Sequence, residues 1–290
     1  MNYKKLLIEK LKAFRRKLIW GRLESDQEDI RNLLIDLRAE FKRDIDVNPI
    51  SKKGKKCFSQ GDEDGITLEI IRRLDLVDGV FVELGVGNGM ENNTLILKAL
   101  GWSGVWISGE PIVPRIGSAN DHFIFDCCWI TKSNITEKIL GNLQRVGRDN
   151  INFLSVDLDG NDLLYVKEFL QRSKLRPEVI CVEYNAKFPP PIKWSMPFNE
   201  DHTWASDDYF GASLMSYVEL LSGFDYSLVA CNNMSGANAF FIHNKHSARF
   251  DDVPKNVDDV YKPPNYNFSS KHGHKQSVKL VQELLDSSKL

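Results

Sequence analysis

The sequence has 290 residues, enough for one large hydrophobic core or for one core with an appendage. Hydrophobic residues make up 42% and charged residues 27%, and the formal net charge of −2 gives no overall attraction to nucleic acid, which we do not expect as a partner. No apolar run is long enough to cross a bilayer, and the cysteines lack C-x-x-C spacing, so neither a transmembrane segment nor a disulfide framework is indicated and a cytoplasmic protein fits best.

The first 50 residues (1–50) predict a helical arm. Two helices are expected, at residues 3–19 and 25–43, and the second repeats apolar residues at helical spacing, at Ile30, Leu33, Leu34, Leu37 and Phe41. The first helix is basic and amphipathic, which suits either an anionic membrane surface or a docking arm with a solvated charged face. We favour the docking arm, which would join copies of the chain into a homo-oligomer.

A buried strand followed by a glycine-rich turn organises the rest of the chain. Residues 80–82 are apolar without polar alternation, as expected for a strand covered on both faces, and Glu83 stands at the end of this strand. Gly85, Gly87 and Gly89 follow at alternate positions, and glycine lets a ligand approach the backbone closely. Residues 92–100 then predict a helix.

Two kinds of nucleotide-type cofactor use such a turn. Dinucleotide binding requires G-x-G-x-x-G, but the third glycine would fall on Met90 when counted from Gly85, and on Asn92 when counted from Gly87. The pattern present is E-x-G-x-G-x-G, with an acid ahead of the glycines. An ordinary turn between a strand and a helix is the alternative, and the preceding acid favours a cofactor site.

Strand and helix patterns alternate along residues 57–245, which predict the main domain. Strands are expected at 104–110, 122–126, 151–157 and 179–185, helices at 66–74, 162–173 and 212–222, and a closing β-hairpin at 226–231 and 237–243. This order predicts an α/β fold: a doubly wound, mostly parallel seven-stranded sheet with helices on both faces and an N-terminal helical arm. Residues 246–290 predict a polar tail with a short helix near 277–285.

Five predicted strands end in acidic residues, which are Glu83, Glu110, Asp126, Asp157 and Glu183. Ligands of such sheets bind at the carboxyl ends of the strands, so these acids are expected around one site. Glu110 stands where an acid would accept hydrogen bonds from both ribose hydroxyls. Asp126 would meet an adenine ring, unless it is an ordinary surface acid in a turn.

Several short motifs together resemble the FkbM-type and related S-adenosylmethionine (SAM) dependent methyltransferases. They are S-Q-x-x-E-D-G at 59–65, E-x-G-x-G-x-G at 83–89 with E-N-N-T at 91–94, G-W-S-G-V-W-I at 101–107, S-V-D-L-D-G-N-D at 155–162, V-E-Y-N-A at 182–186, Y-x-G-A-S at 209–213 and G-A-N-A-F-F at 236–241. Each motif alone is unspecific, but the combination spans residues 57–243. The family usually places its ribose-binding acid where Ser108 stands, so either a local bulge brings Glu110 into the site or ribose binding is altered.

The resemblance implies a Rossmann-like methyltransferase fold and a SAM-dependent O-methyltransferase. The acceptor would be a hydroxyl of a small molecule, a sugar by resemblance, linked to a nucleotide or belonging to a surface polysaccharide. Cofactor binding is expected at Gln60, Asp64, Glu83, Gly85, Gly87, Gly89, Asn93, Thr94, Glu110, Asp126 and Asp157. Acceptor binding is expected at Tyr209, Ser213 and Asn238.

Methyl transfer to a sugar also requires that the acceptor hydroxyl lose its proton. Asp157, Asp159, Glu183 and Asn185 offer hard oxygen ligands for Mg²⁺ or Mn²⁺, which would lower the pKa of that hydroxyl, in a layout similar to metal-dependent O-methyltransferases. Without a metal, Asp157 would contact the amino group of SAM and the other side chains would bind acceptor hydroxyls.

A long segment rich in proline and aromatic residues, 188–209, is expected to cover the acceptor. It contains His202, which we predict as a general base acting together with the catalytic Asp157. Two other functions stay open at this point. The chain could be a nicotinamide-dependent oxidoreductase, against which the glycine spacing argues, or a non-catalytic binding protein with a methyltransferase fold, which the Ser108 departure favours.

Overall fold

The computed structural model describes residues 37–113 and 122–265, together with a few isolated positions before residue 37. The chain divides into two compact units, residues 1–45 and residues 46–290. In the first unit the described positions from 26 to 45 are helical, as predicted for the second helix of the arm. The predicted helices at 3–19 and 277–285 lie outside the described residues, apart from the helical position Lys12. Within the described part of the chain, we find no helix whose length and apolar content would let it cross a membrane.

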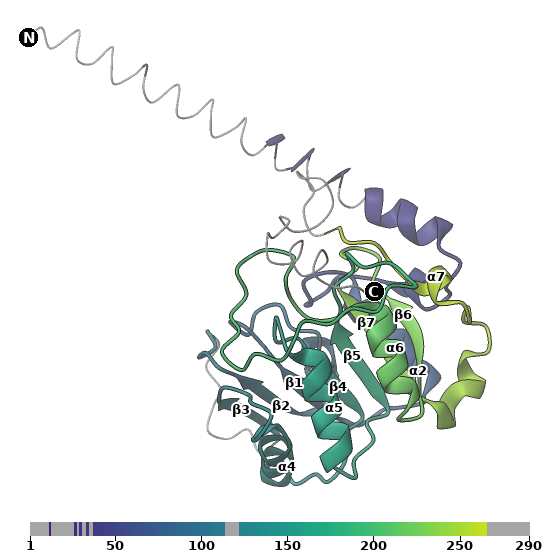
Figure 1. The fold of residues 1–290 in the computed structure, drawn as a ribbon. Coiled ribbons are helices and arrows are strands. Elements are labelled where there is room, and N and C mark those ends of the chain that lie inside the picture. Colours follow the sequence, from purple (N-terminus) through teal and green to yellow (C-terminus); the bar gives the residue numbers. More distant parts are fainter. Residues whose placement is uncertain are drawn as a thin grey trace, which may run out of the picture. The chain divides into compact units, whose positions relative to one another are not determined.

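The second unit is a sheet surrounded by helices (Figure 1). Its strands are β1 (Val80–Leu84), β2 (Ser103–Ser108), β3 (Phe123–Cys127), β4 (Phe153–Val156), β5 (Val179–Glu183), β6 (Tyr226–Cys231) and β7 (Asn238–His243). Its α-helices are α2 (Glu63–Arg73), α3 (Leu95–Ala99), α4 (Ile135–Arg145), α5 (Asp162–Arg172), α6 (Leu214–Ser222) and α7 (Val257–Val260). Two 3₁₀ turns, η1 (Ser51–Lys53) and η2 (Asn244–Phe250), complete the unit.

The seven strands form one sheet in the order β3-β2-β1-β4-β5-β7-β6. Neighbours from β3 to β5 pair in parallel, whereas β7 runs antiparallel to both β5 and β6. The central strand β1 sets the register, with Val82 opposite Val105 of β2 and Leu154 of β4. The predicted α/β fold is therefore confirmed: this is the doubly wound, mostly parallel, Rossmann-like sheet of a methyltransferase fold.

Alternate residues of each strand feed two separate cores, because successive side chains of a strand point to opposite faces. On one face, Val80, Val82 and Leu84 pack with the helices α4, α5 and α6. On the other face, Phe81 packs with α2 and α3. With both faces covered, the parallel strands β1, β2 and β4 are buried along their whole length, which explains their apolar runs.

One helix of the sheet's covering layer, α4, was missing from the sequence-based elements. Ile135, Ile139 and Leu143 recur at helical spacing and are buried, so the periodic signal was present in the chain. The structure also ends β2 at Ser108, which leaves Glu110 in the following loop rather than at the end of the strand.

Candidate functional site

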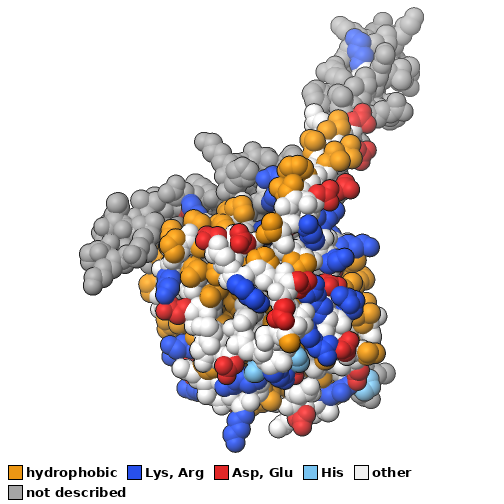
Figure 2. Space-filling view, turned by 90° about the vertical axis from the view of Figure 1, so that its right-hand side faces the viewer, with side chains coloured by type: hydrophobic (Ala, Val, Ile, Leu, Met, Phe, Trp, Pro, Cys, Tyr) orange, Lys and Arg blue, Asp and Glu red, His pale blue; other side chains and the backbone are white. Residues whose placement is uncertain are grey.

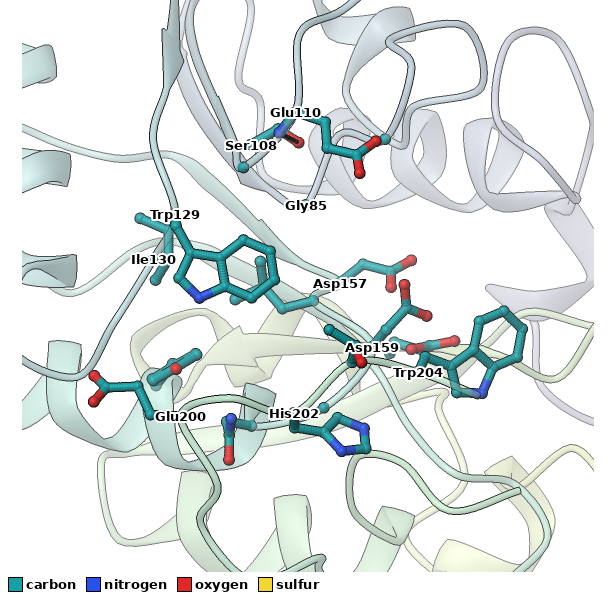
Figure 3. A pocket seen from close by; sticks show the side chains of 18 of the residues that line it. Gly85, Ser108, Glu110, Trp129, Ile130, Asp157, Asp159, Glu200, His202 and Trp204 are labelled. Atoms are coloured by element: carbon teal, nitrogen blue, oxygen red, sulfur yellow. Dashed lines mark hydrogen bonds between the residues drawn. The ribbon is translucent and has the colours of Figure 1, made fainter. Parts of the chain in front are cut away.

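A cavity of about 590 Å³ lies at the carboxyl ends of the central strands. The order of the sheet reverses between β1 and β4, and a doubly wound sheet binds its ligand at such a point. Figure 3 shows that the lining comes from loops far apart in the sequence. The lining residues used below are Gln60, Gly85, Gly87, Ser108, Glu110, Trp129, Asp157, Asp159, Asn161, Tyr165, Glu183, Glu200, His202 and Trp204.

The glycine-rich turn after β1 forms one wall of this cavity. Gly85, Gly87 and Gly89 have φ angles of +82°, +50° and +80°, a left-handed conformation that side chains other than glycine rarely adopt. A Cβ atom on Gly85 would lie 1.5 Å from the backbone oxygen of Asp157. Glycine is therefore required where the β1 turn meets the β4 loop, and the two loops reach the cavity together.

Three carboxylates form the floor of the cavity. One oxygen from each of Asp157, Asp159 and Glu183 lies within 4.8 Å of the others. Burial, followed by the charge of Asp159, raises the pKa of Asp157 well above its ordinary value, and burial, followed by the charge of Asp157, does the same for Glu183. Such a group favours either a retained proton or a bound cation. The backbone of Asp159 also stands at φ +55°, a strained conformation at the point where its side chain meets the cavity.

The fourth predicted metal ligand, Asn185, is held by other partners. Its Nδ2 donates to the backbone oxygens of Asp208 and Phe210 at 2.9 and 3.0 Å, and its Oδ1 accepts from the backbone N–H of Lys187. Asn185 is buried and does not line the cavity. These bonds fix the start of the segment that leads into the covering loop, and a role of Asn185 in metal binding stays a prediction.

The loop that carries Asp157 and Asp159 is held by a further acid, Asp162. Its carboxylate accepts from the backbone N–H of Leu158 at 2.6 Å and from that of Gly160 at 2.9 Å. Burial raises the pKa of Asp162 to about 6. Asp162 is the first residue of α5, where the helix dipole favours a negative charge. Its role is to position the floor of the cavity.

Glu83, predicted to bind the cofactor, holds the loop before α3 and does not line the cavity. It accepts from the backbone N–H of Asn93 at 2.9 Å, and from the backbone N–H and the hydroxyl of Thr94. Asn93 donates to the hydroxyl of Ser155, so none of these three predicted cofactor contacts faces the cavity. Burial raises the pKa of Glu83 to about 7.

A similar arrangement holds the loop before α2. The Oδ2 atom of Asp64 accepts from the backbone N–H groups of Cys57, Phe58 and Ser59 at 2.6–2.8 Å. Asp64 does not line the cavity, whereas Gln60 at the tip of the same loop does. Of the two predicted contacts in this motif, the structure brings only Gln60 to the cavity.

The loops after β2 and β3 form the wall opposite the acidic floor. Glu110 lines the cavity although β2 ends two residues before it. The loop after β2 therefore brings Glu110 to the site, in agreement with the first of the two alternatives predicted from the sequence. Asp126 does not line the cavity; its carboxylate accepts from Asn142 Nδ2 at 2.9 Å and lies 3.5 Å from Lys138 Nζ, both on α4. Trp129, which the sequence did not single out, lines this wall, and 54% of its surface is exposed.

The covering loop (residues 188–209) reaches the cavity through its second half. Glu200, His202 and Trp204 line it. The loop is fastened to α5 by Asn161, which donates to the backbone oxygen of Asn199 at 2.7 Å and accepts from the N–H of Asn199 at 3.1 Å. A Cβ atom on Gly160 would lie 2.7 Å from His202 Cδ2, so the imidazole packs directly over the acidic loop.

The predicted acceptor-binding residues do not line the cavity. Tyr209 packs edge-on against Trp194, and Ser213 accepts from the N–H of Ser216 as the N-cap of α6. Asn238 donates to Glu63 Oε1 at 3.1 Å. Each holds the covering loop or the hairpin, and an acceptor contact at these positions stays a prediction.

Comparisons with known proteins add little to this geometry. No protein-family model matches the sequence, and no curated protein matches it. A solved structure titled as a fibrillarin/Nop5p complex matches with a TM-score of 0.32 and 13% identity, over 57% of this chain and 72% of that chain. A structure titled for the conversion of a disulfide bond into a thioacetal group during echinomycin biosynthesis matches with a TM-score of 0.28 and 12% identity, over 77% and 88% of the two chains. The sheet order, rather than these distant matches, carries the assignment of the fold.

Proposed function

We propose that this protein is a SAM-dependent O-methyltransferase that acts on a hydroxyl of a polyhydroxylated small molecule of the sugar class. One observation carries the proposal: at the reversal point of the sheet, a glycine turn and an acidic floor face one cavity. The glycine turn offers backbone without side chains to a cofactor, and the acids offer oxygen atoms to a hydroxyl or a cation. A nicotinamide cofactor would require a different glycine spacing.

The residues around the cavity fit SAM. Glu110 offers a carboxylate for ribose hydroxyls, and the exposed ring of Trp129 on the same wall offers a flat apolar surface for adenine. Gly85, Gly87 and Gln60 lie on the side where the methionine end would be held. In the transfer, the acceptor oxygen forms a bond to the methyl carbon while the methyl–sulfur bond breaks and leaves its electron pair on sulfur.

The acceptor proton requires a base, and His202 is our candidate. The imidazole packs over Gly160 of the acidic loop and lines the cavity together with Asp159. A divalent cation on Asp157, Asp159 and Glu183 would supply the Lewis acidity that weakens the O–H bond of the acceptor. These oxygen ligands are of the type that Mg²⁺ and Mn²⁺ prefer.

Calorimetric titration of the purified protein with SAM tests the cofactor assignment, with NAD as the comparison ligand. We expect SAM to bind in the micromolar range and Gly87→Val to abolish this binding, because the side chain would enter the glycine wall. Gly101→Val is the matched control. Gly101 also has a positive φ and open space at its Cβ, but it precedes β2, at the amino ends of the strands and away from the cavity. Binding of NAD instead of SAM, or equal effects of the two variants, would contradict the assignment.

Titration of EDTA-treated protein with Mn²⁺, in the presence of SAM, tests the metal site. We expect one Mn²⁺ per chain, detected by the loss of the free-ion signal in electron paramagnetic resonance. If Mn²⁺ stays free at millimolar concentration, the metal proposal is wrong and Asp157 would act on the cofactor's amino group or on the acceptor directly.

A further inference from the structure

The charge of the cavity lining is one-sided. Among the described residues that line it there are five carboxylates, one imidazole, one phenol and no lysine or arginine; the ionisable residues are Glu110, Asp157, Asp159, Glu183, Glu200, His202 and Tyr165. The bias belongs to the cavity and not to the whole protein, whose formal net charge is −2. On the face shown in Figure 2, basic and acidic side chains lie interspersed. Even with a divalent cation on the floor, the five carboxylates outnumber its two positive charges, and a cleft lined by one sign of charge concentrates ligands of the opposite sign and repels those of the same sign.

The backbone amides of the loops around the cavity are a second, independent observation against a phosphate ligand. Phosphate sites in α/β proteins use free N–H groups of loops at helix N-termini, supported by arginine or lysine. Here the loop before α2 gives its N–H groups to Asp64, and Gly61 gives its own to Glu63 at 2.8 Å. The loop before α5 gives those of Leu158 and Gly160 to Asp162.

The loop before α3 repeats this arrangement, since Asn93 and Thr94 donate to Glu83. Three loops that could hold an anion therefore already hold a carboxylate of the protein itself. The N–H donors named in these three loops are therefore committed to the fold.

The aromatic residues at the covering loop instead suit an uncharged or positively charged ring. Tyr165, which contacts Phe198 of that loop, and Trp204 line the cavity, and aromatic faces stack on the apolar faces of sugar rings and attract cations. In Figure 3, Glu200 lies well apart from Asp159 and Trp204, so a carboxylate also stands away from the acidic floor. An amine on the acceptor would find this carboxylate while a ring hydroxyl faces the floor.

We infer that the acceptor is a phosphate-free glycoside that is neutral or carries an amine, and not a sugar attached to a nucleoside diphosphate. This inference rests on the proposed function and narrows its acceptor class. Of the two sources that the family resemblance implies, it removes the nucleotide-linked sugar. It also names Glu200 as a specificity-determining residue.

Binding of three matched sugars tests the inference. The probes are methyl glucoside, its 2-amino-2-deoxy analogue and its 6-phosphate, each titrated by saturation-transfer NMR into protein saturated with S-adenosylhomocysteine. We expect the amino sugar to bind most tightly and the phosphate most weakly, with the difference shrinking at high salt, as expected for screened charges. Equal or tighter binding of the phosphate, or no binding of any probe, would overturn the inference.

Glu200→Lys sharpens the test. The substitution should reduce the preference for the amino sugar over the phosphate by roughly two- to fivefold, the scale of one partly exposed charge pair. Asp149→Lys is the matched control, because Asp149 is exposed before β4 at the amino edge of the sheet, and it should leave the preference unchanged. An equal effect of both variants would show that net charge alone acts, and would overturn the role of Glu200.

The first step of the experiment separates the two proposals. If S-adenosylhomocysteine does not bind, the proposed function fails and takes the inference with it. If S-adenosylhomocysteine binds and the phosphate is preferred, the inference fails alone and the methyltransferase proposal stands.

Discussion

Two groups of acidic residues stand at the cavity and in the loops around it, yet they do opposite things in the molecule. In the loops around the cavity, Asp64 and Asp162 accept hydrogen bonds from two or more backbone N–H groups each. On the cavity floor, Asp157 and Glu183 are neighbours of each other and of Asp159. After burial, the charge of Asp159 raises the pKa of Asp157, and the charges of Asp157 and Asp159 raise the pKa of Glu183. The first group stabilises loop conformations, whereas the second keeps oxygen atoms together at a cost in stability.

The difference teaches how the site is assembled. A carboxylate that accepts backbone hydrogen bonds fixes a loop without a ligand, because charged acceptors make stronger hydrogen bonds than neutral ones. Carboxylates that face one another gain only when a proton, a cation or a ligand joins them. The acids that hold the loops are therefore expected to govern stability, and the acids on the floor to govern binding.

Asp157→Asn should produce the largest effect on the floor. Removing one of the three carboxylates should weaken Mn²⁺ binding by about tenfold or more. Even the loss of a group that only hydrogen-bonds to a metal ligand commonly lowers metal affinity by that factor. Without metal, the free energy of unfolding should stay the same or rise by about 1 kcal/mol, because one repulsive charge is removed. Paramagnetic resonance and urea denaturation measure the two effects. Asp149→Asn is the control at the amino edge; if it weakened Mn²⁺ binding as much as Asp157→Asn, the floor would not be the metal site.

Asp64→Ala should have the opposite profile. The substitution removes the acceptor for the N–H groups of Cys57, Phe58 and Ser59, and the free energy of unfolding should fall by about 2–4 kcal/mol. Mn²⁺ binding measured well below the unfolding transition should change little. A variant of unchanged stability that no longer binds SAM would reverse the comparison, because Asp64 would then act on the cofactor as the sequence suggested.

The sequence could establish the sheet because the signals for its strands are local. The apolar run of β1 and the left-handed glycines after it need no knowledge of distant residues, and the predicted hairpin is formed by β6 and β7. The helix α4 was within reach too, since its buried residues recur at helical spacing.

The sequence could not separate the two groups of acids. Glu83 is the last residue but one of the buried strand β1, Glu183 is the last residue of β5 in the same sheet, and both follow a valine. Glu83 meets the backbone of residues 93–94, whereas Glu183 meets Asp157, and these contacts depend on how each loop folds over its strand. Trp129 could not be predicted either, because no periodic pattern marks a loop residue that lines a cavity between strands distant in the sequence.

Glu63, another loop-holding acid, should make the stability of the protein depend on pH. Glu63 accepts from the N–H of Gly61 and from the amides of Asn232 and Asn238, and burial, followed by the charge of Asp62, raises its pKa to about 7. Because the folded state holds this proton more tightly than the unfolded state, the stability that Glu63 contributes is complete below about pH 4.5 and is lost as the pH rises through about 7. Between pH 5 and pH 8 the free energy of unfolding should therefore fall, by roughly 1–3 kcal/mol for this group.

Glu63→Gln tests this expectation, because glutamine has the shape of the protonated acid and no charge. Urea denaturation at pH 5 and pH 8 should show a smaller loss of stability in the variant than in the original protein. Glu69→Gln is the matched control on the same helix α2: hydrogen bonds from Arg72, then from Arg73, lower the pKa of Glu69 to about 2, so its contribution is constant between pH 5 and pH 8. If both variants changed the pH dependence equally, the effect would come from the total charge of α2, and the prediction that the buried Glu63 causes it would be wrong.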